Sequence, residues 1–165
     1  LSDTVIFKSP TTTPEDKATA ARLAKIAGVK DMKALGLKLF EAKSQVKGVP
    51  AADLLKRDFK PFTMSGVKVG VAQLEVVDLA ILTPLKADLQ KAMVALKGEG
   101  YHTLLFMLTD VMAEGTDLLV LTDDQALVEG ALDLKLKAGS VWLPGVMSRK
   151  KQIIPKLEKA FKPKA

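Results

Sequence analysis

The sequence predicts an α/β fold in which a mixed β-sheet of about five strands is covered by helices. Its 165 residues suit one well-packed domain. With 48% hydrophobic and 27% charged residues, the composition is that of a globular chain rather than a disordered one. The hydrophobic period changes in the order helices, hairpin, helix, strand, strand, helix, strand, helix, which is typical of a mixed sheet with helical layers.

The amino-terminal third is predicted to be mostly helical. Residues 4–7 are β-branched or aromatic and lead into a Ser-Pro pair, which predicts a short strand before a loop. Thr13 precedes a proline and is a good N-cap, so a helix should begin there and end near Gly28. Apolar spacing predicts two further helices, over about 31–46 and 50–56.

The middle of the chain is predicted to contain a hairpin, a helix and a buried strand. Residues 59–64 and 67–75 indicate two paired strands, because Ser65-Gly66 suits a tight turn and valines alternate with other residues after it. Apolar residues recur at helical spacing over 85–96. The continuous apolar run at 103–108 indicates a strand that is buried on both faces.

The carboxyl-terminal third is predicted to end the sheet and to finish with a helix. A strand is expected at 118–121 and a short helix at 123–130. Over 132–137, leucines alternate with charged residues, which predicts a final strand with one face in solvent. The last helix is expected to begin after Arg149-Lys150, with Pro155 tolerated in its first turn.

The positive charge of the chain is concentrated at one end. Residues 149–165 contain seven Lys or Arg and one Glu, a net of +6, and the whole chain also carries +6. Residues 1–148 are therefore balanced. A protein that coats nucleic acid usually spreads its positive charge over a face, so this distribution weakens a nucleic-acid interpretation, and we expect no nucleic-acid partner.

Several chemistries are disfavoured by residue types that are missing or rare. The absence of cysteine excludes disulfides, thiolate metal sites and a cysteine nucleophile. The single histidine, His102, argues against a His-rich metal site or a Ser-His-Asp triad. There is no glycine-rich phosphate loop, no signal peptide and no apolar run of the ~18 residues that a membrane span needs. A cytoplasmic protein with no membrane partner is expected.

The run from Ser148 to Gln152 is the strongest candidate for a binding site. Arg149 carries five donors in a rigid fork that can grip phosphate oxygens in pairs, while Lys150 supplies a compact point charge. A helix that starts after them would add backbone N–H groups aimed at the same anion. The alternative is a solvated basic helix, which is the more common meaning of a charge run.

Three weaker candidates each have an ordinary structural explanation. Lys60, within a predicted strand, could contact an anion or simply face solvent. Asp3 could ligate a hard cation, or it could cap a turn. Thr109-Asp110 follows the most buried strand, where ligand-facing groups occur in α/β sheets, but Asp110 could equally cap a turn.

Taken together, these segments resemble the carboxyl-terminal DHHA2 domain of the manganese-dependent, family II inorganic pyrophosphatases in the DHH phosphoesterase superfamily. The resemblance covers nearly the whole chain, and the run from Ser148 to Gln152 is its most specific element. The other matching segments, in the family's order, are Leu1-Ser2-Asp3-Thr4, Phe7-Lys8-Ser9-Pro10-Thr11, Thr13-Pro14-Glu15-Asp16, Phe59-Lys60-Pro61-Phe62, Val71-Ala72-Gln73 and Phe106-Met107-Leu108-Thr109-Asp110.

The resemblance implies roles for four residues. Residues 1–12 would be the end of the amino-terminal DHH domain and the linker, and 13–165 would be the DHHA2 substrate-binding domain. Asp3 would be a metal ligand, while Lys60, Arg149 and Lys150 would bind pyrophosphate. Such an enzyme hydrolyses pyrophosphate to two phosphates with Mn²⁺, or with Mg²⁺ or Co²⁺, in a dinuclear site.

The same resemblance implies that the chain is incomplete as an enzyme. The Asp-His-His motif and the other metal ligands of the DHH domain are missing, so this chain alone is expected to be inactive and to hold no metal stably. The partners implied are pyrophosphate and the missing domain. The isolated chain is expected to be a monomer and the full enzyme a homodimer.

Two other functions remain open at this level. An exopolyphosphatase or a prune-like phosphoesterase would share the domain and its phosphate chemistry. A non-catalytic module could instead use the basic carboxyl terminus to bind nucleic acid or acidic protein.

Overall fold

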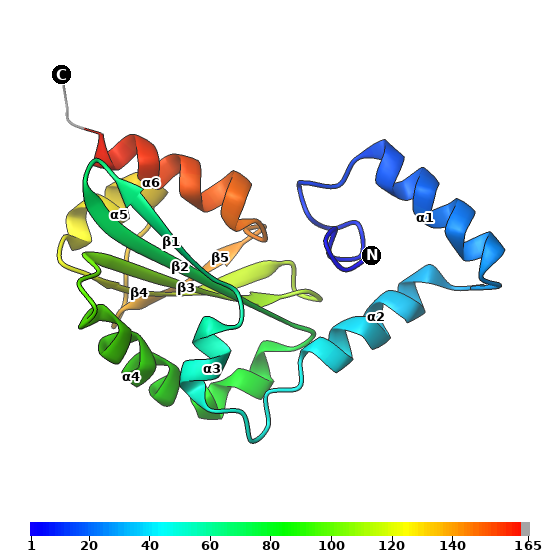
Figure 1. The fold of residues 1–165 in the computed structure, drawn as a ribbon, viewed down its shortest axis with the longest axis horizontal. Helices are drawn as coiled ribbons and strands as arrows, with labels where there is room; N and C mark the ends of the chain where they lie inside the picture. Colours follow the sequence, from blue (N-terminus) through cyan, green and yellow to red (C-terminus); the bar gives the residue numbers. More distant parts are fainter. Residues whose placement is uncertain (163–165) are drawn as a thin grey trace.

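The computed structural model describes residues 1–162 and contains the expected mixed sheet of five strands (Figure 1). The strands lie in the order β1-β2-β3-β4-β5, with β2 and β3 parallel and the other neighbouring pairs antiparallel. Their bounds are β1 Phe59–Met64, β2 Val67–Val76, β3 Thr103–Asp110, β4 Gly115–Thr122 and β5 Ser140–Pro144. The α/β class and the mixed sheet predicted from the sequence are confirmed.

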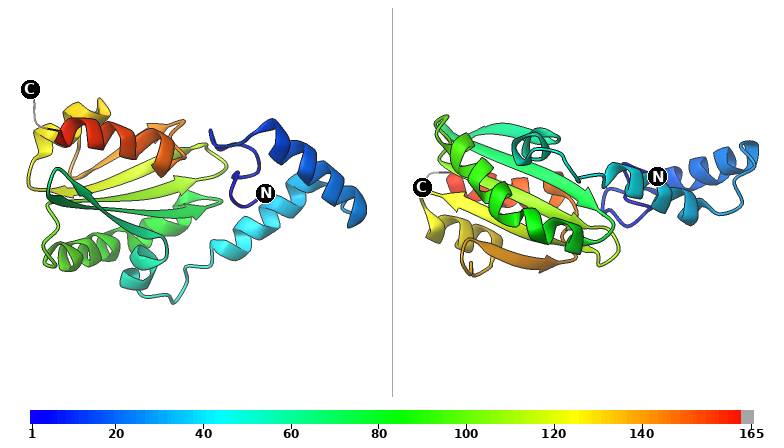
Figure 2. Two further views of the ribbon diagram at one scale, coloured as in Figure 1. Left: turned by 45° about the horizontal axis from the view of Figure 1, so that its top comes forward. Right: turned by 90° about the horizontal axis from the view of Figure 1, so that it is seen from below.

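Helices cover both faces of the sheet (Figures 1 and 2). Alternate residues of β3 belong to two separate cores: Leu104, Phe106 and Leu108 to one, Leu105 and Met107 to the other. The first core lies under α3 (Ala51–Lys56), the 3-10 helix η1 (Leu79–Leu85) and α4 (Lys86–Lys97), and the second under α5 (Gln125–Leu132) and α6 (Ile154–Phe161). Burial on both faces explains why β3 is a continuous apolar run.

Helices α1 (Pro14–Ile26) and α2 (Met32–Lys43) extend to one side of the sheet, beside the amino-terminal turn (Figures 1 and 2). Helix α1 begins with a capping box between Thr13 and Asp16, but it contributes no buried residue. A third small core joins this part to the sheet; it consists of Val5, Ile6, Phe40, Val111 and Met147.

The strand predicted over residues 4–7 is wrong. Val5, Ile6 and Phe7 have φ angles of 50°, 53° and 64°, so this segment forms a left-handed turn closed by its own backbone hydrogen bonds. Such angles cost roughly 1–2 kcal/mol for each residue. The β-branched side chains of Val5 and Ile6 are buried in the third core, which supplies the compensating burial and explains their presence without a strand partner.

The strand predicted over 132–137 is also wrong. Asp133, with φ +54°, ends α5, and the following segment makes one isolated bridge, between Lys137 and Ser140. The alternating leucines cover the second core without joining a ladder of the sheet. The edge position is taken instead by β5, which pairs with β4 through Thr116 and Leu143.

Candidate anion-binding site

The four candidate site residues line one cavity near the carboxyl end of β2. Asp3, Lys60, Arg149 and Lys150 come from three distant parts of the chain and border a cavity of about 430 Å³. The remaining lining residues are Val5, Ser9, Thr11, Phe62, Gln73, Glu75, Met147, Ser148 and Ile154. A compact ligand in this cavity could therefore meet cations from both β1 and the loop that follows β5.

Lys60 and Lys150 provide two exposed cations at this cavity. Lys60 lies on the edge strand β1, opposite Val71, and the adjacent Pro61 suits an edge because it has no N–H to donate. Among residues 1–162, neither ammonium group has an ion-pair or hydrogen-bond partner. Both donors are therefore available to an anion.

Gln152 and Ser148 organise the loop that leads into the helix of Arg149 and Lys150. The Gln152 Oε1 accepts hydrogen bonds from the backbone N–H groups of Met147 and Ser148, both at 2.9 Å, and its Nε2 donates to the carbonyl of Gly145 at 2.8 Å. Ser148 Oγ accepts from the N–H of Lys151 at 3.3 Å. Two members of the basic motif thus build the loop and cap the helix, rather than reaching toward a ligand.

The helix after Ser148 opens with a π-helical turn, η2 (Arg149–Ile153), before it continues as α6. A π-helical turn is frequently found at functional sites because it alters the direction of neighbouring side chains. Lys151 donates to the carbonyl of Pro10 at 2.6 Å. The basic motif therefore also fixes the amino-terminal turn on which Asp3 lies.

A buried polar network supports the same loop from the sheet. Gln73 Nε2 donates to Thr109 Oγ1 and to the carbonyl of Met147, both at 3.1 Å. Thr109 Oγ1 lies 3.0 Å from Thr116 Oγ1, which donates to the carbonyl of Val146 at 2.6 Å. Because each of these buried groups has a partner, the network holds the loop in one place.

Asp110 caps a turn and does not line the cavity. Its carboxylate accepts hydrogen bonds from the backbone N–H groups of Leu79, Met112 and Ala113, at 2.7–2.9 Å. Of the two interpretations of Thr109-Asp110, the structural one therefore describes the molecule.

Arg149 is held by protein groups to a degree that the sequence did not indicate. It is 8% exposed, and its two terminal nitrogens donate to the carboxylate and the carbonyl of Asp58 and to the carbonyl of Val71. The fork expected to grip a phosphate in pairs is thus largely engaged inside the protein. Arg149 contributes mainly to the wall of the cavity.

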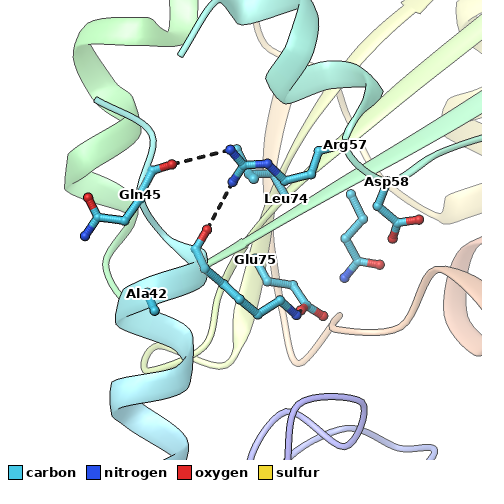
Figure 3. Close-up of a pocket in the computed structure, with 8 residues that line it drawn as sticks. Ala42, Gln45, Arg57, Asp58, Leu74 and Glu75 are labelled. Atoms are coloured by element: carbon cyan, nitrogen blue, oxygen red, sulfur yellow. Dashed lines mark hydrogen bonds and ion pairs between the residues drawn. The ribbon is translucent and has the colours of Figure 1, made fainter. Parts of the chain in front are cut away.

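A neighbouring cavity of about 550 Å³ is lined by Asp58 and shares Gln73 and Glu75 with the anion cavity (Figure 3). Figure 3 shows Arg57 donating to the carbonyls of Lys43 and Gln45, at 3.0 and 3.4 Å, which fixes the segment after α2. Glu75 lines both cavities. Burial raises the pKa of Glu75, against the opposing effect of Lys43 at 3.3 Å.

Asp3 is exposed and supplies one carboxylate to the anion cavity. Within residues 1–162, no group of three or more His, Asp or Glu side chains is arranged to hold a metal ion. Asp3 and Glu75 are the two carboxylates that line this cavity, and two carboxylates alone do not make a dinuclear site, so the described residues do not fit such a site without ligands from elsewhere.

Asp58 and Gln73 hold parts of the site through hydrogen bonds, and the sequence analysis gave neither of them a role. Asp58 stands two residues before Lys60, at the start of a strand, where an acidic residue is common and carries little signal. Gln73 interrupts the apolar run of β2, and a polar residue inside a strand that is buried on both faces could have indicated a buried network.

The comparisons with known proteins agree with this architecture. The family model described as the DHHA2 domain matches residues 37–160. The chain belongs to the DHHA2 domain family. The match begins inside α2, so α1 and the amino-terminal turn lie outside the matched region.

Similar proteins carry pyrophosphatase names. A protein of Archaeoglobus fulgidus named probable manganese-dependent inorganic pyrophosphatase is 53% identical over 98% of this chain and 50% of its own length. A manganese-dependent inorganic pyrophosphatase of Methanocaldococcus jannaschii is 43% identical over 98% of this chain and 52% of its own length. A crystal structure from Methanococcus jannaschii, described as that of a "putative family II inorganic pyrophosphatase", superposes with a TM-score of 0.89 at 43% identity, over 96% of this chain and 52% of that one.

This chain spans about half the length of these relatives. A cobalt-dependent inorganic pyrophosphatase of Clostridium perfringens is 40% identical, and 29% of its length is covered. In the part of the chain that the structure describes, no helix combines the length and the apolar character needed to cross a bilayer.

Proposed function

We propose that this chain is the substrate-binding half of a metal-dependent inorganic pyrophosphatase, in which Lys60, Arg149 and Lys150 bind pyrophosphate. The observation that carries the proposal is the single cavity that these cations share with Asp3. The names of relatives that are 40–53% identical support pyrophosphate as the anion. The similarity to these relatives extends over nearly the whole chain, including the segments that line the cavity.

The residue types suit a small and densely charged anion. Lys60 and Lys150 are exposed point charges that can each neutralise phosphoryl oxygens, while the buried Arg149, paired with Asp58, lines the same cavity. Phosphoryl transfer depends mainly on positioning and on charge stabilisation, and cations gathered around one cavity serve both. The side chain of Gln152 and the network around Gln73 in β2 both hold the loop that leads to Arg149 and Lys150.

We also propose that the metals are held mainly by a second half of the enzyme. Manganese is the expected metal, with cobalt or magnesium as alternatives, and Asp3 would be the ligand that this chain contributes. In this proposal residues 1–12 are the end of the DHH half and its linker, and 13–165 form the substrate-binding domain. The isolated chain would then be inactive, because it lacks most of the metal ligands.

The exposed apolar side chains of α1 and α2 support a neighbouring half. Leu23 and Ile26 on α1 are 51% and 73% exposed, and Leu35 on α2 is 38% exposed. Exposed apolar patches often mark contact surfaces. In the proposal, the DHH half covers this face, the isolated chain is a monomer, the full enzyme is a cytoplasmic homodimer, and nucleic acid is not a partner.

Calorimetric titration of the 165-residue chain with pyrophosphate tests the binding function. Lys60→Ala and Lys150→Ala should each weaken binding by about tenfold, because each removes one charge-assisted contact. Lys156→Ala is the matched control, since it removes the same charge from an exposed position on α6 outside the cavity. Equal losses in all three variants would show that binding follows net charge and would overturn the site.

A chimaera tests the catalytic part. The amino-terminal half of the 53%-identical Archaeoglobus relative, joined to this chain, should hydrolyse pyrophosphate in the presence of Mn²⁺. Faster cleavage of long-chain polyphosphate would favour an exopolyphosphatase instead. Micromolar binding of nucleic acid at physiological salt, with no pyrophosphate binding, would favour a non-catalytic basic module.

A further inference from the structure

Asp58 and Arg149 form a contact between the two cavities. Asp58 lines the cavity of Figure 3, Arg149 lines the anion cavity, and Gln73 and Glu75 line both. Asp58 also stands immediately before β1, two residues from Lys60. One acidic residue therefore contacts the guanidinium and belongs to the segment that leads into the strand of Lys60.

The Arg149 guanidinium donates four hydrogen bonds, three of them to Asp58. Arg149 Nη1 donates to the Asp58 carbonyl at 2.7 Å and to the Val71 carbonyl at 3.1 Å, while Nη2 donates to both carboxylate oxygens of Asp58, at 2.8 and 3.1 Å. The Arg149 side chain is 9% exposed and that of Asp58 is 48% exposed. The Asp58 carbonyl also accepts from the N–H of Gln73 at 3.1 Å, so the acceptors are themselves fixed to β2.

We infer that Asp58 is a positioning residue, which holds the Arg149 guanidinium at the wall of the anion cavity before any ligand arrives. The inference rests on the proposed function, because it assigns a role in the same site. A free arginine side chain has many rotamers, and ordering it upon binding lowers affinity. Four acceptors around the two terminal nitrogens remove that cost and keep the cation beside Lys60 and Lys150.

Electrostatics alone makes the opposite prediction. A carboxylate close to an anion site repels the anion, so its removal should strengthen binding. If Asp58 acts by positioning Arg149, its removal should weaken binding although a negative charge has been lost. The direction of the change therefore separates the two roles.

Calorimetric titration of the chain with pyrophosphate provides the test. Asp58→Asn should weaken binding by about five- to tenfold, and Asp58→Glu, which restores the carboxylate, should recover part of that loss. Asp53→Asn is the matched control: it removes an exposed carboxylate on α3 that lines neither cavity and does not contact Arg149, so it should leave binding unchanged or slightly strengthen it. Tighter binding by Asp58→Asn would overturn the inference.

A mutant cycle with Arg149→Ala separates this inference from the proposed function. Arg149→Ala should weaken binding, and adding Asp58→Asn to it should cause no further weakening. Wild-type affinity in Arg149→Ala would contradict the proposed role of Arg149 and the inference with it. Weakened binding in Arg149→Ala together with unweakened binding in Asp58→Asn would overturn the positioning role alone.

A measurement without ligand keeps the inference testable if a variant folds poorly. Nitrogen-15 NMR of the Arg149 side chain should resolve its Nη protons separately in the wild-type chain, because the four hydrogen bonds slow rotation of the guanidinium. In Asp58→Ala, which removes both carboxylate acceptors and leaves the two backbone carbonyls, the Nη2 protons should exchange faster than in the wild-type chain. Averaged Nη signals in the wild-type chain would show that the guanidinium is not held, and would overturn the inference.

Discussion

Gln152 should contribute far more to the free energy of unfolding than its partly exposed position suggests. Its side chain satisfies the backbone N–H groups of Met147 and Ser148, which belong to residues only 4% and 7% exposed, and it donates to the carbonyl of Gly145. Gln152→Ala leaves two buried donors without a partner. An unsatisfied buried donor costs about 1–3 kcal/mol, and entering water offsets part of this, so the expected loss is about 2–4 kcal/mol.

Urea unfolding followed by circular dichroism measures this loss directly, provided that the slope of the transition is unchanged. Gln125→Ala is the matched control, because Gln125 is exposed on α5 and makes one side-chain hydrogen bond, to Glu129. It should cost about 0.5 kcal/mol or less. Gln152→Glu keeps the accepting oxygen and loses the donor, so it should fall between the two.

The reasoning would be refuted if Gln152→Ala cost no more than the Gln125 control. That result would mean that the loop between β5 and η2 is held by the Gln73 network without help from Gln152. If the loss is found, pyrophosphate affinity should fall as well, since the same loop leads directly into the helical turn of Arg149 and Lys150.

Three further predictions concern other parts of the molecule. Hydrogen bonds from Lys135, then from a glutamine and a backbone N–H, lower the pKa of Glu129 from 4.5 to about 2. The ionised carboxylate therefore stabilises the fold above its ordinary pKa. This contribution is lost as the pH falls from 4.5 toward 2. Glu129→Gln should lower the melting temperature at pH 7 and flatten its decline over that acid range, whereas an unchanged acid profile would contradict the role. Gly70→Ala would place Cβ 2.5 Å from an aromatic ring carbon and should lower the free energy of unfolding by about 1–3 kcal/mol. Gly130→Ala in helix α5, where nothing lies within 4 Å of the new Cβ, should be neutral or stabilising. Equal urea midpoints for the two variants would contradict this prediction. Because α1 buries no residue, its backbone amides should exchange with deuterium well before those of β3. Thr13→Ala should speed exchange in α1 without changing the global melting temperature. Protection of the α1 amides equal to that of the β3 amides would contradict this prediction.

The spacing of apolar residues was sufficient to predict the helices and strands that bury apolar side chains on a regular face. The hairpin of β1 and β2, helix α4 and the fully buried β3 lie where apolar spacing predicted them. It failed where apolar residues were buried without regular structure. Val5 and Ile6 have strand propensity but pack in a left-handed turn, and the leucines of 132–137 cover a core without pairing. In both cases tertiary burial, which spacing does not encode, decided the conformation.

The sequence also predicted the site only in part. The basic motif and its helix were visible in the sequence, and the structure places the predicted cations around one cavity. The different structural role of each residue in the motif could not be predicted from the sequence. Gln152 and Ser148 serve the backbone, and Arg149 is engaged by Asp58, a residue 91 positions away. Contacts over such distances depend on how the strands are ordered in the sheet, which the local pattern does not determine.

A crystal structure of this chain with pyrophosphate would test the central claim most directly. The account predicts both phosphoryl groups inside the cavity bounded by Lys60, Arg149 and Lys150, with the Lys60 and Lys150 ammonium groups within hydrogen-bond distance of phosphoryl oxygens. Pyrophosphate bound instead along the lysines of α6, with the cavity free of it, would contradict the account.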